Sequence, residues 1–354
     1  MLEPPFCPYR RCPQHIRPAP RFDSRHGSYP CLCRPRPVPR FRCKSCRRTF
    51  SRQTFRMDYC DNRPSLNPRL FELLASGIGL RQSSRILGLS RRCTELKARK
   101  IGRHLRRLNL NLRGQLPPGS SFQLDELETY EGRRNTRPLS VPTLIETKSR
   151  FIVWAEAAPI RPKGTMTPQR LAAIRADRRR FGLRKDLSRR SLVRTLQRGV
   201  DLSRRLGSVL VDTDEKASYP GLLEDAFGSA RLDHIQTSSK RLRTSDNPLF
   251  AINQTEAIMR DLTGRVRRES WLVSKLRRWL DVALHVHITY RNYVRRRFNR
   301  DQASPAELLG FVKRRLRPPE VLSWRQEFGA RSLHPLGHGV RRIEEESGRA
   351  FRAA

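Results

Sequence analysis

Two pairs of cysteines near the N-terminus limit how the beginning of this chain can fold. Cys7 and Cys12 form one pair, and Cys43 and Cys46 form a second pair further along. Residues 1–58 hold six of the eight cysteines, many prolines and little apolar periodicity, so we do not expect this segment to bury a core of its own. Two close thiolate pairs suit tetrahedral Zn²⁺, and metal binding then supplies folding free energy on the order of 10 kcal/mol. We predict a zinc-ribbon module over residues 1–58 that binds structural Zn²⁺.

The second cysteine pair has the clearer local context. Cys43 and Cys46 lie within residues 41–50, which read as a turn between two short strands. Cys31-x-Cys33 is spaced more tightly than a zinc pair usually is. His15 and His26 remain alternative ligands, and the competing interpretation is a set of unpaired thiols in a basic arm.

Net charge indicates the class of partner. The chain has 354 residues, with 74 Lys and Arg against 33 Asp and Glu, a formal charge of +41. A field this positive favours polyanions through steering and counterion release, although a compositional bias toward arginine would give the same excess. The hydrophobic share, 37%, allows sizeable cores. At roughly 150 residues per domain, the length suggests two or three domains.

No segment has the features of a membrane span or a secretory leader. The best apolar run, residues 151–155, is far shorter than the roughly 18 residues that a span needs. The start of the chain has no apolar stretch of the kind found in signal peptides. We therefore expect a cytoplasmic protein with no membrane partner, whose cysteines are metal ligands or inert thiols rather than disulfides.

Residues 62–112 read as an all-α, DNA-binding helix-turn-helix domain. We expect helices over Pro68–Ala75, over Leu80–Leu87 and from Arg91 to about Leu105, with Ser90 as the N-cap of the last. A basic helix after a glycine-containing turn suits the major groove of DNA, whereas a plain helical hairpin would carry the same charges into solvent. The expected DNA-binding residues are Arg91, Arg92, Lys97, Arg99, Lys100 and Arg103.

From residue 121 to about residue 299 the pattern alternates between strands and helices. The order is three strands, a helix, a strand, a helix, a strand and a helix, which is the order of an RNase H-like domain, an α/β fold with a mixed sheet flanked by helices. Asp125 lies within the first strand, and Asp212 and Asp214 lie at the end of the fourth. The first and fourth strands are neighbours in that sheet, so these acids would lie side by side, as two-metal phosphoryl transfer requires.

The chain resembles bacterial insertion-sequence transposases of the DDE type that carry an N-terminal zinc finger and a helix-turn-helix. The resemblance runs from about Cys7 to Phe298. It rests on an ordered set of segments: Arg42–Ser51 (RCKSCRRTFS), Gln123–Tyr130 (QLDELETY), Thr213–Tyr219 (TDEKASY), Ile252–Arg260 (INQTEAIMR), Arg267–Lys275 (RRESWLVSK) and Tyr290–Tyr293 (YRNY).

The resemblance implies a catalytic triad of acids. The first falls on Asp125 and the second on Asp214, since the family pattern is Thr-Asp, four residues, then Tyr; Asp212 is the alternative. The third falls on Asn253, and an amide cannot replace an anionic ligand. Glu256 lies one helical turn further on, on the same face, and is our predicted third acid and Mg²⁺ ligand. Asp261 lies at the flank of the apolar stripe and is a weaker candidate.

Taken together, the sequence predicts four parts and one activity. The parts are residues 1–58, residues 62–112, an RNase H-like catalytic domain over residues 121–299, and a basic C-terminal extension over residues 300–354. The resemblance implies a nucleoid-associated bacterial DNA transposase. It would bind terminal inverted repeats and target double-stranded DNA as a homo-oligomer, with structural Zn²⁺ and about two catalytic Mg²⁺ ions. The alternatives are a catalytically inactive zinc-containing DNA-binding protein derived from a transposase, and a basic RNA-binding or ribosome-associated protein.

Overall fold

The computed structural model describes residues 4–31, 34, 36–111, 114–238, 240–242, 244–267 and 272–324. Contacts divide the chain into two compact units. The first gathers residues 1–69, 103–112 and 319–354, and the second comprises residues 70–102 and 113–318. The division falls within the predicted helix-turn-helix region, because its last helix contributes residues to both units.

The first unit contains a small antiparallel sheet. Its strands are β1 (Asp23–Tyr29), β2 (Val38–Cys43) and β3 (Thr49–Ser51), in that order across the sheet. The turn between β2 and β3 holds Cys46, as the sequence predicted. A short helix, α1 (Pro13–Ile16), follows Cys12. The unit also contains 3-10 turns at Arg52–Phe55 and Pro64–Leu66.

Contrary to the sequence analysis, this segment does bury a small core. Aromatic side chains from loops and strands pack around the cysteines, and their rings meet edge to face or stacked. They come from positions without any helical or strand period, so periodicity did not reveal them. The buried members are Phe6, Phe22, Phe50 and Phe55.

Three helices follow where the sequence predicted them. They are α2 (Asn67–Ala75), α3 (Leu80–Ile86) and α4 (Arg91–Leu110). The Ser90 hydroxyl accepts a hydrogen bond from the Cys93 amide at 3.2 Å, which makes Ser90 the N-cap of α4. The last helix continues past the predicted end near Leu105, and Leu105 and Leu110 are both buried.

The second unit is built on a mixed sheet. Its strands are β4 (Ser121–Tyr130), β5 (Pro138–Glu146), β6 (Ile152–Ala155), β7 (Ala158–Pro159), β8 (Val209–Asp214) and β9 (Leu232–Thr237). The order is β6-β5-β4-β8-β9, and β7 also pairs with β5. The first three strands are antiparallel, whereas β8 and β9 run parallel to β4. The predicted α/β architecture with a mixed sheet is confirmed.

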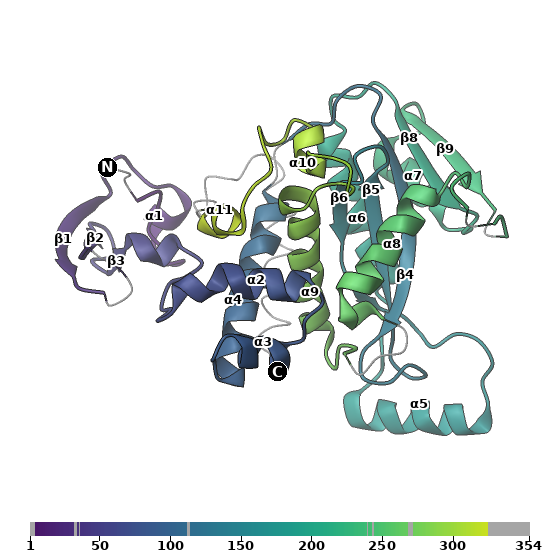
Figure 1. Ribbon diagram of the computed structural model, residues 1–354, viewed down its shortest axis with the longest axis horizontal. Coiled ribbons are helices and arrows are strands. Elements are labelled where there is room, and N and C mark those ends of the chain that lie inside the picture. The colour runs from purple at the N-terminus through teal and green to yellow at the C-terminus, as the bar shows by residue number, and fades with distance from the viewer. Residues whose placement is uncertain are drawn as a thin grey trace. The chain divides into compact units, whose positions relative to one another are not determined.

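Helices cover both faces of this sheet (Figure 1). On one face lie α6 (Ser188–Leu202) and α7 (Tyr219–Phe227). A Cβ atom on Gly199 would lie only 2.7 Å from Leu144 Cδ2, so α6 sits directly on β5. On the other face, α8 (Phe250–Leu262) and α9 (Arg277–Thr289) share a buried apolar cluster with β4, β5 and β6.

The helix α9 was not predicted, and Asn292 just beyond it secures the edge strand. Its side-chain oxygen accepts from the Ile152 amide at 2.9 Å, and its side-chain nitrogen donates to the Ile152 carbonyl at 2.8 Å. The side-chain amide of Asn292 thus makes the two backbone hydrogen bonds that a neighbouring strand would make with Ile152. A π-helical turn at Tyr290–Val294 places Asn292 there.

Two further segments differ from the predicted helices. The sequence pattern predicts one helical stretch from Pro305 to Arg315 within the C-terminal extension, and this prediction is wrong. Helix α10 covers only Pro305–Leu308, because Gly310 adopts a left-handed backbone at φ +71°. The sequence also predicts a break at Pro318 and Pro319. Instead, the two prolines begin α11 (Pro318–Ser323), since the first turn of a helix tolerates proline. Residues 325–354 lie outside the described residues.

Among the described residues, no helix combines the length and the apolar character that a bilayer crossing requires.

A buried histidine on α9 predicts how stability depends on pH. His287 is 1% exposed, and burial, followed by the charges of Arg291 and Arg295, lowers its pKa from 6.5 to about 3. The folded state therefore keeps the ring neutral, while the unfolded chain takes up a proton below pH 6.5. The resulting stability is complete above pH 6.5 and is lost as the pH falls toward 3, by about 1.4 kcal/mol per pH unit.

We expect His287→Leu to remove this contribution. Chemical denaturation at pH 7 and pH 5 should show that the variant loses about 2 kcal/mol less than the wild type over this interval. Parallel pH profiles for the two proteins would contradict the prediction.

Candidate active site

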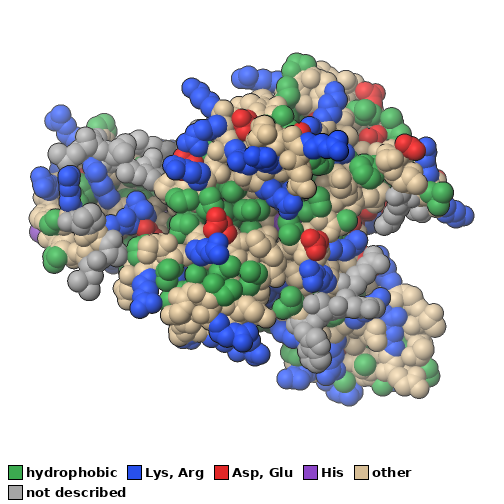
Figure 2. Space-filling model, viewed as in Figure 1, with side chains coloured by type: hydrophobic (Ala, Val, Ile, Leu, Met, Phe, Trp, Pro, Cys, Tyr) green, Lys and Arg blue, Asp and Glu red, His purple; other side chains and the backbone are tan. Residues whose placement is uncertain are grey.

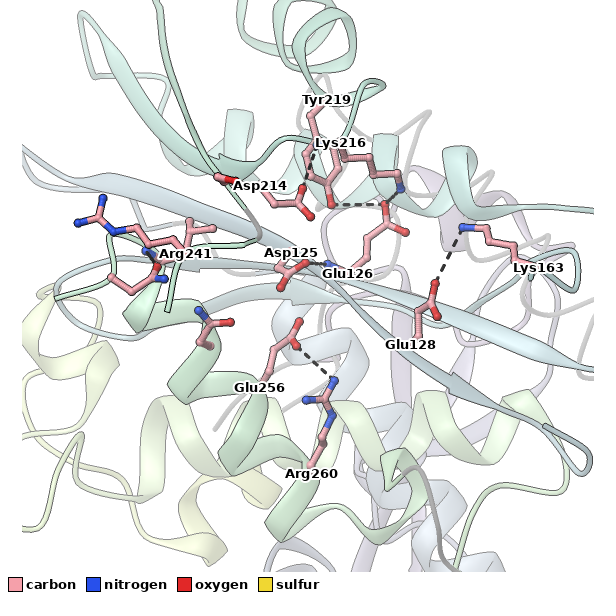
Figure 3. A pocket seen from close by; sticks show the side chains of 14 residues that line it. Asp125, Glu126, Glu128, Lys163, Asp214, Lys216, Tyr219, Arg241, Glu256 and Arg260 are labelled. Atoms are coloured by element: carbon pink, nitrogen blue, oxygen red, sulfur yellow. Dashed lines mark hydrogen bonds and ion pairs between the residues drawn. The ribbon is translucent and has the colours of Figure 1, made fainter. Parts of the chain in front are cut away.

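Two aspartates meet where β8 ends beside the middle of β4. Strand β4 pairs with β8 so that Gln123 is opposite Asp212 and Leu124 is opposite Thr213. The next step of the same register sets Asp125 beside Asp214. Paired residues on parallel strands face the same side of a sheet, and the two carboxylates line one cavity (Figure 3).

Helix α8 brings a third carboxylate to this cavity. Gln123 holds the start of the helix: its side-chain nitrogen donates to the Pro248 carbonyl at 2.6 Å, and its oxygen accepts from the Ile252 amide at 2.9 Å. Because Gln123 lies two residues before Asp125, one face of β4 positions both the first acid and the helix. Glu256 on that helix lines the cavity and is 4% exposed.

Glu256 is also paired with a cation. Its Oε2 atom lies 3.6 Å from Arg260 Nη2, one helical turn further along α8. Asn253, the position on which the family's third acid falls, lines the same cavity. The structure therefore brings both sequence candidates for the third position to the site.

The cavity has a volume of about 270 Å³ and is lined mostly by charged side chains. Five are acids and four are bases, which alternate around it in Figure 3. Such a site can bind cations through its carboxylates and anionic groups through its rim. The lining acids are Asp125, Glu126, Glu128, Asp214 and Glu256, and the bases are Lys163, Lys216, Arg241 and Arg260.

Glu126 lines the cavity although the sequence analysis gave it no role. It accepts hydrogen bonds from Lys216 Nζ, from the Tyr219 hydroxyl at 3.5 Å and from the Ser140 hydroxyl at 2.5 Å. Lys216 and Tyr219 follow β8 in the chain, so they tie β4 to the segment after the second aspartate. The adjacent pair Asp125-Glu126 was the available signal, but strand alternation alone places Glu126 on the opposite face.

The pKa of Tyr219 reflects the number of carboxylates close to its hydroxyl. Burial raises the pKa of its phenol well above the ordinary value, and four nearby carboxylates raise it further. In order of effect these are Glu126, Asp125, Asp214 and Glu256.

The two alternative acids lie outside the cavity lining. Asp212 accepts a hydrogen bond from Gln123 Nε2 at 3.5 Å, and burial raises its pKa against the opposing effects of Gln123 and His234. Asp261 has a side chain that is 77% exposed and lies 3.6 Å from Arg267. Neither carboxylate lines the cavity with Asp125.

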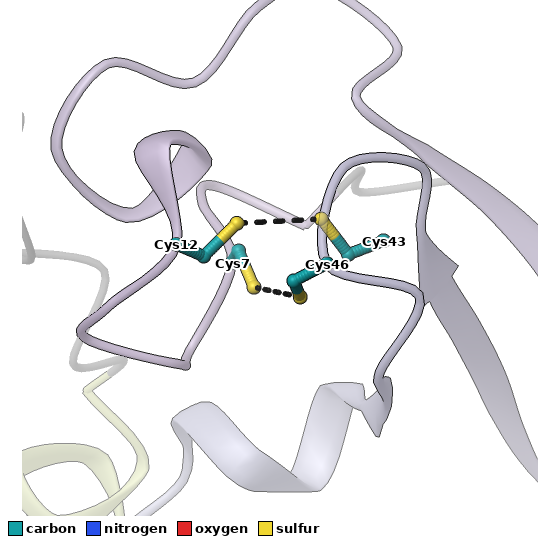
Figure 4. A group of neighbouring side chains, drawn as sticks. All are labelled: Cys7, Cys12, Cys43 and Cys46. Atoms are coloured by element: carbon teal, nitrogen blue, oxygen red, sulfur yellow. Dashed lines mark hydrogen bonds between the residues drawn. The ribbon is translucent and has the colours of Figure 1, made fainter.

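The four predicted zinc ligands form one cluster in the first unit (Figure 4). Their sulfur atoms all lie within 4.8 Å of one another. Cys7 Sγ is 3.7 Å from Cys46 Sγ, and Cys12 Sγ is 3.7 Å from Cys43 Sγ. Tetrahedral Zn²⁺ with bonds of about 2.3 Å requires sulfur separations of about 3.8 Å. The cluster therefore has the dimensions of a structural zinc site.

The alternative ligands do not join this cluster. His15 Nδ1 lies 2.7 Å from the Cys7 carbonyl oxygen, so the ring contacts the backbone beside a ligand. His26 is exposed on β1, and Cys31 is not part of the group of four. Cys33 lies outside the described residues.

The predicted DNA-binding side chains on α4 differ in accessibility. Arg91, Arg92 and Arg103 are exposed, whereas Lys97 is only 4% exposed. The Arg99 guanidinium lies over the Trp279 ring at 5.3 Å, and Lys100 is half-buried. Lys97 is therefore the member least suited to contact a duplex in this conformation.

In comparisons with known proteins, no protein-family model and no curated protein matches the chain.

Proposed function

We propose that this protein is an insertion-sequence DNA transposase of the DDE type with an RNase H-like catalytic domain. The observation that carries the proposal is the convergence of Asp125, Asp214 and Glu256 on one cavity from two adjacent strands and a helix. The sheet order supports it, since three antiparallel strands are followed by two parallel ones. The positive charge of the chain supports a DNA substrate.

The donor set suits Mg²⁺. This ion prefers a few carboxylates together with water and substrate phosphates, and Asp125, Asp214 and Glu256 would be its ligands. The chemistry that such ions supply is activation of the attacking hydroxyl and stabilisation of the leaving oxygen.

The chain's own residues hold these acids and orient the DNA. Gln123 fixes α8 against β4, so Glu256 and Asp125 keep their separation. Lys216 and Tyr219 hold Glu126 on the other side of β4. Arg241 and Lys163 on the rim can bind the phosphates flanking the scissile bond.

The proposed reaction has two steps. Water attacks the phosphorus at the end of the element, and the departing oxygen becomes a free 3′-hydroxyl. That hydroxyl then attacks a phosphodiester of the target, joining the strand and releasing the 3′-oxygen of the target. Recognition of the element's ends is assigned to α4 through its exposed arginines, with a homo-oligomer bringing two ends together.

Strand cleavage tests this proposal. DNA that carries the gene's own flanks should be nicked by the wild type with Mg²⁺ or Mn²⁺, and Asp125→Ala should remove nicking while DNA affinity is retained. Tight binding of the flanks without nicking under either metal would contradict the proposal and favour a DNA-binding protein that no longer cuts.

Two substitutions on α8 identify the third metal ligand: one replaces Glu256 by its amide, and the other replaces Asn253 by alanine. We expect Glu256→Gln to reduce nicking about 10²-fold or more, because the amide removes a negative charge from the metal site. Asn253→Ala, one helical turn away and lining the same cavity, should reduce nicking less than about ten-fold.

Both variants should be compared at matched DNA occupancy, so that a change in binding is not read as a change in chemistry. A larger loss with Asn253→Ala than with Glu256→Gln would move the third ligand to Asn253.

A further inference from the structure

A basic helix stands apart from the sheet of the second unit. Helix α5 (Pro168–Phe181) lies in the long connection between β7 and α6, and none of its residues is buried. Figure 1 shows it beyond the end of β4, joined by extended segments at both ends. Residues 161–190 contain eleven Lys and Arg but only two acids.

One face of this helix is attached to the rest of the unit. Asp177 lies 3.6 Å from Arg137, whose guanidinium also lies over the Phe181 ring at 4.5 Å. Arg170 donates to the Asn135 carbonyl at 3.3 Å. Arg170, Asp177 and Phe181 follow a helical spacing of seven and four residues, so they share a face. The turn between β4 and β5 therefore holds this side of α5.

The opposite face of α5 carries three exposed arginines. Arg175, Arg178 and Arg179 have the spacing of three and four that places them together, and all three are exposed. In the part of the chain that the structure describes, none of the three forms an ion pair. Figure 2 shows Lys and Arg side chains along the rim of the lobe that contains α5.

The segment that leads into α5 also reaches the acid cavity. Lys163 lines that cavity, with its Nζ 3.9 Å from Glu128 Oε1, and α5 begins only a few residues later. One cation of this segment thus lies on the rim of the site, five residues before α5 begins.

We propose that the Arg175, Arg178 and Arg179 face of α5 binds the phosphate backbone of duplex DNA whose scissile bond occupies the acid cavity. The choice of DNA as the polyanion rests on the proposed function. Anchoring through Arg137 fixes the direction of the basic face, so less entropy is lost in orienting the helix when its arginines bind phosphates. Such contacts position the duplex without reading its sequence.

Photocrosslinking tests the direction of this face. A photoactivatable phenylalanine analogue is placed at Leu171, on the basic face, or at Phe181, on the anchored face about 80° away around the helix. Phe181 is 58% exposed and Leu171 is 39% exposed, so exposure alone would give more crosslinks from position 181. With a short duplex of arbitrary sequence, we expect crosslinks from position 171 and few from position 181. Equal yields, or none from position 171, would overturn the proposal.

Salt dependence tests the three arginines themselves. In Arg175→Ala/Arg178→Ala/Arg179→Ala, the slope of log affinity against log salt should fall by about 2 to 3, since each lost phosphate contact contributes about 0.9. The control Lys313→Ala/Arg314→Ala/Arg315→Ala removes the same charge from exposed positions. An equal fall in the control would overturn the proposal, because it would show an effect of net charge alone.

Both measurements are made without added Mg²⁺, so neither depends on cleavage. A protein that crosslinks from position 171 but never nicks DNA contradicts the proposed function and not this inference. A protein that nicks DNA without that crosslink contradicts this inference alone.

Discussion

Cys43→Ser is expected to unfold the N-terminal module and to lower its Zn²⁺ content. The four sulfur atoms join the segment around α1 to the turn between β2 and β3, and only a small aromatic cluster supports them. Structural zinc binding is worth on the order of 10 kcal/mol or more. Loss of one of four thiolates therefore removes more free energy than this small core can replace.

The measurement is the metal content of the purified protein together with limited proteolysis of residues 1–69. Cys60→Ser is the matched control, because Cys60 is exposed and lies outside the cluster of four. The control should keep one Zn²⁺ per chain and resist the protease as the wild type does. Full zinc occupancy and unchanged protection in Cys43→Ser would refute a structural zinc site.

The second large effect is expected at the end of β8. If the cavity binds catalytic Mg²⁺, Asp214→Asn should slow DNA nicking by about three orders of magnitude, or about 4 kcal/mol of transition-state stabilisation. The substitution keeps the size of the side chain and removes one negative charge from the metal site. Affinity for DNA should stay the same or rise, since a carboxylate near phosphates repels them.

Asp212→Asn provides a control on the same strand. Asp212 lies two residues earlier, outside the cavity lining, and an asparagine oxygen can still accept the hydrogen bond from Gln123. We expect its nicking rate to fall less than about ten-fold. If Asp212→Asn is the more damaging of the two, the second metal ligand has been assigned to the wrong aspartate.

The sequence predicted the sheet of the second unit well because its strands carry local signals. Residues 121–130 alternate in the pattern of a half-buried strand, and the structure gives β4 the same bounds. Asp212-Thr-Asp214 follows a short apolar run, which is the usual form of a buried parallel strand. The neighbouring positions of β4 and β8 then follow from strand order.

Other features of the structure could not be predicted, because they depend on contacts between segments far apart in the chain, and the periodicity of apolar residues carries no information about such contacts. Burial of Lys97 and the stacking of Arg99 on Trp279 need the tertiary packing around α4. Glu126 enters the cavity lining only because Lys216 and Tyr219 come to it from the segment after β8. The capping of β6 by Asn292 joins residues 140 positions apart.

The parallel register of β4 and β8 has a consequence for tolerance to mutation. Neighbouring strands are held about 4.8 Å apart by backbone hydrogen bonds, and the pairing of β4 with β8 extends to Leu124 and Thr213, just before the two aspartates. Peptide geometry therefore sets the distance between the backbones of Asp125 and Asp214. Core substitutions that loosen α6 or α7, which cover the face of the sheet away from α8 and Glu256, would lower the melting temperature while this spacing stays constant. Activity per folded molecule should then remain level across a series of destabilised variants and disappear only when the sheet itself unfolds.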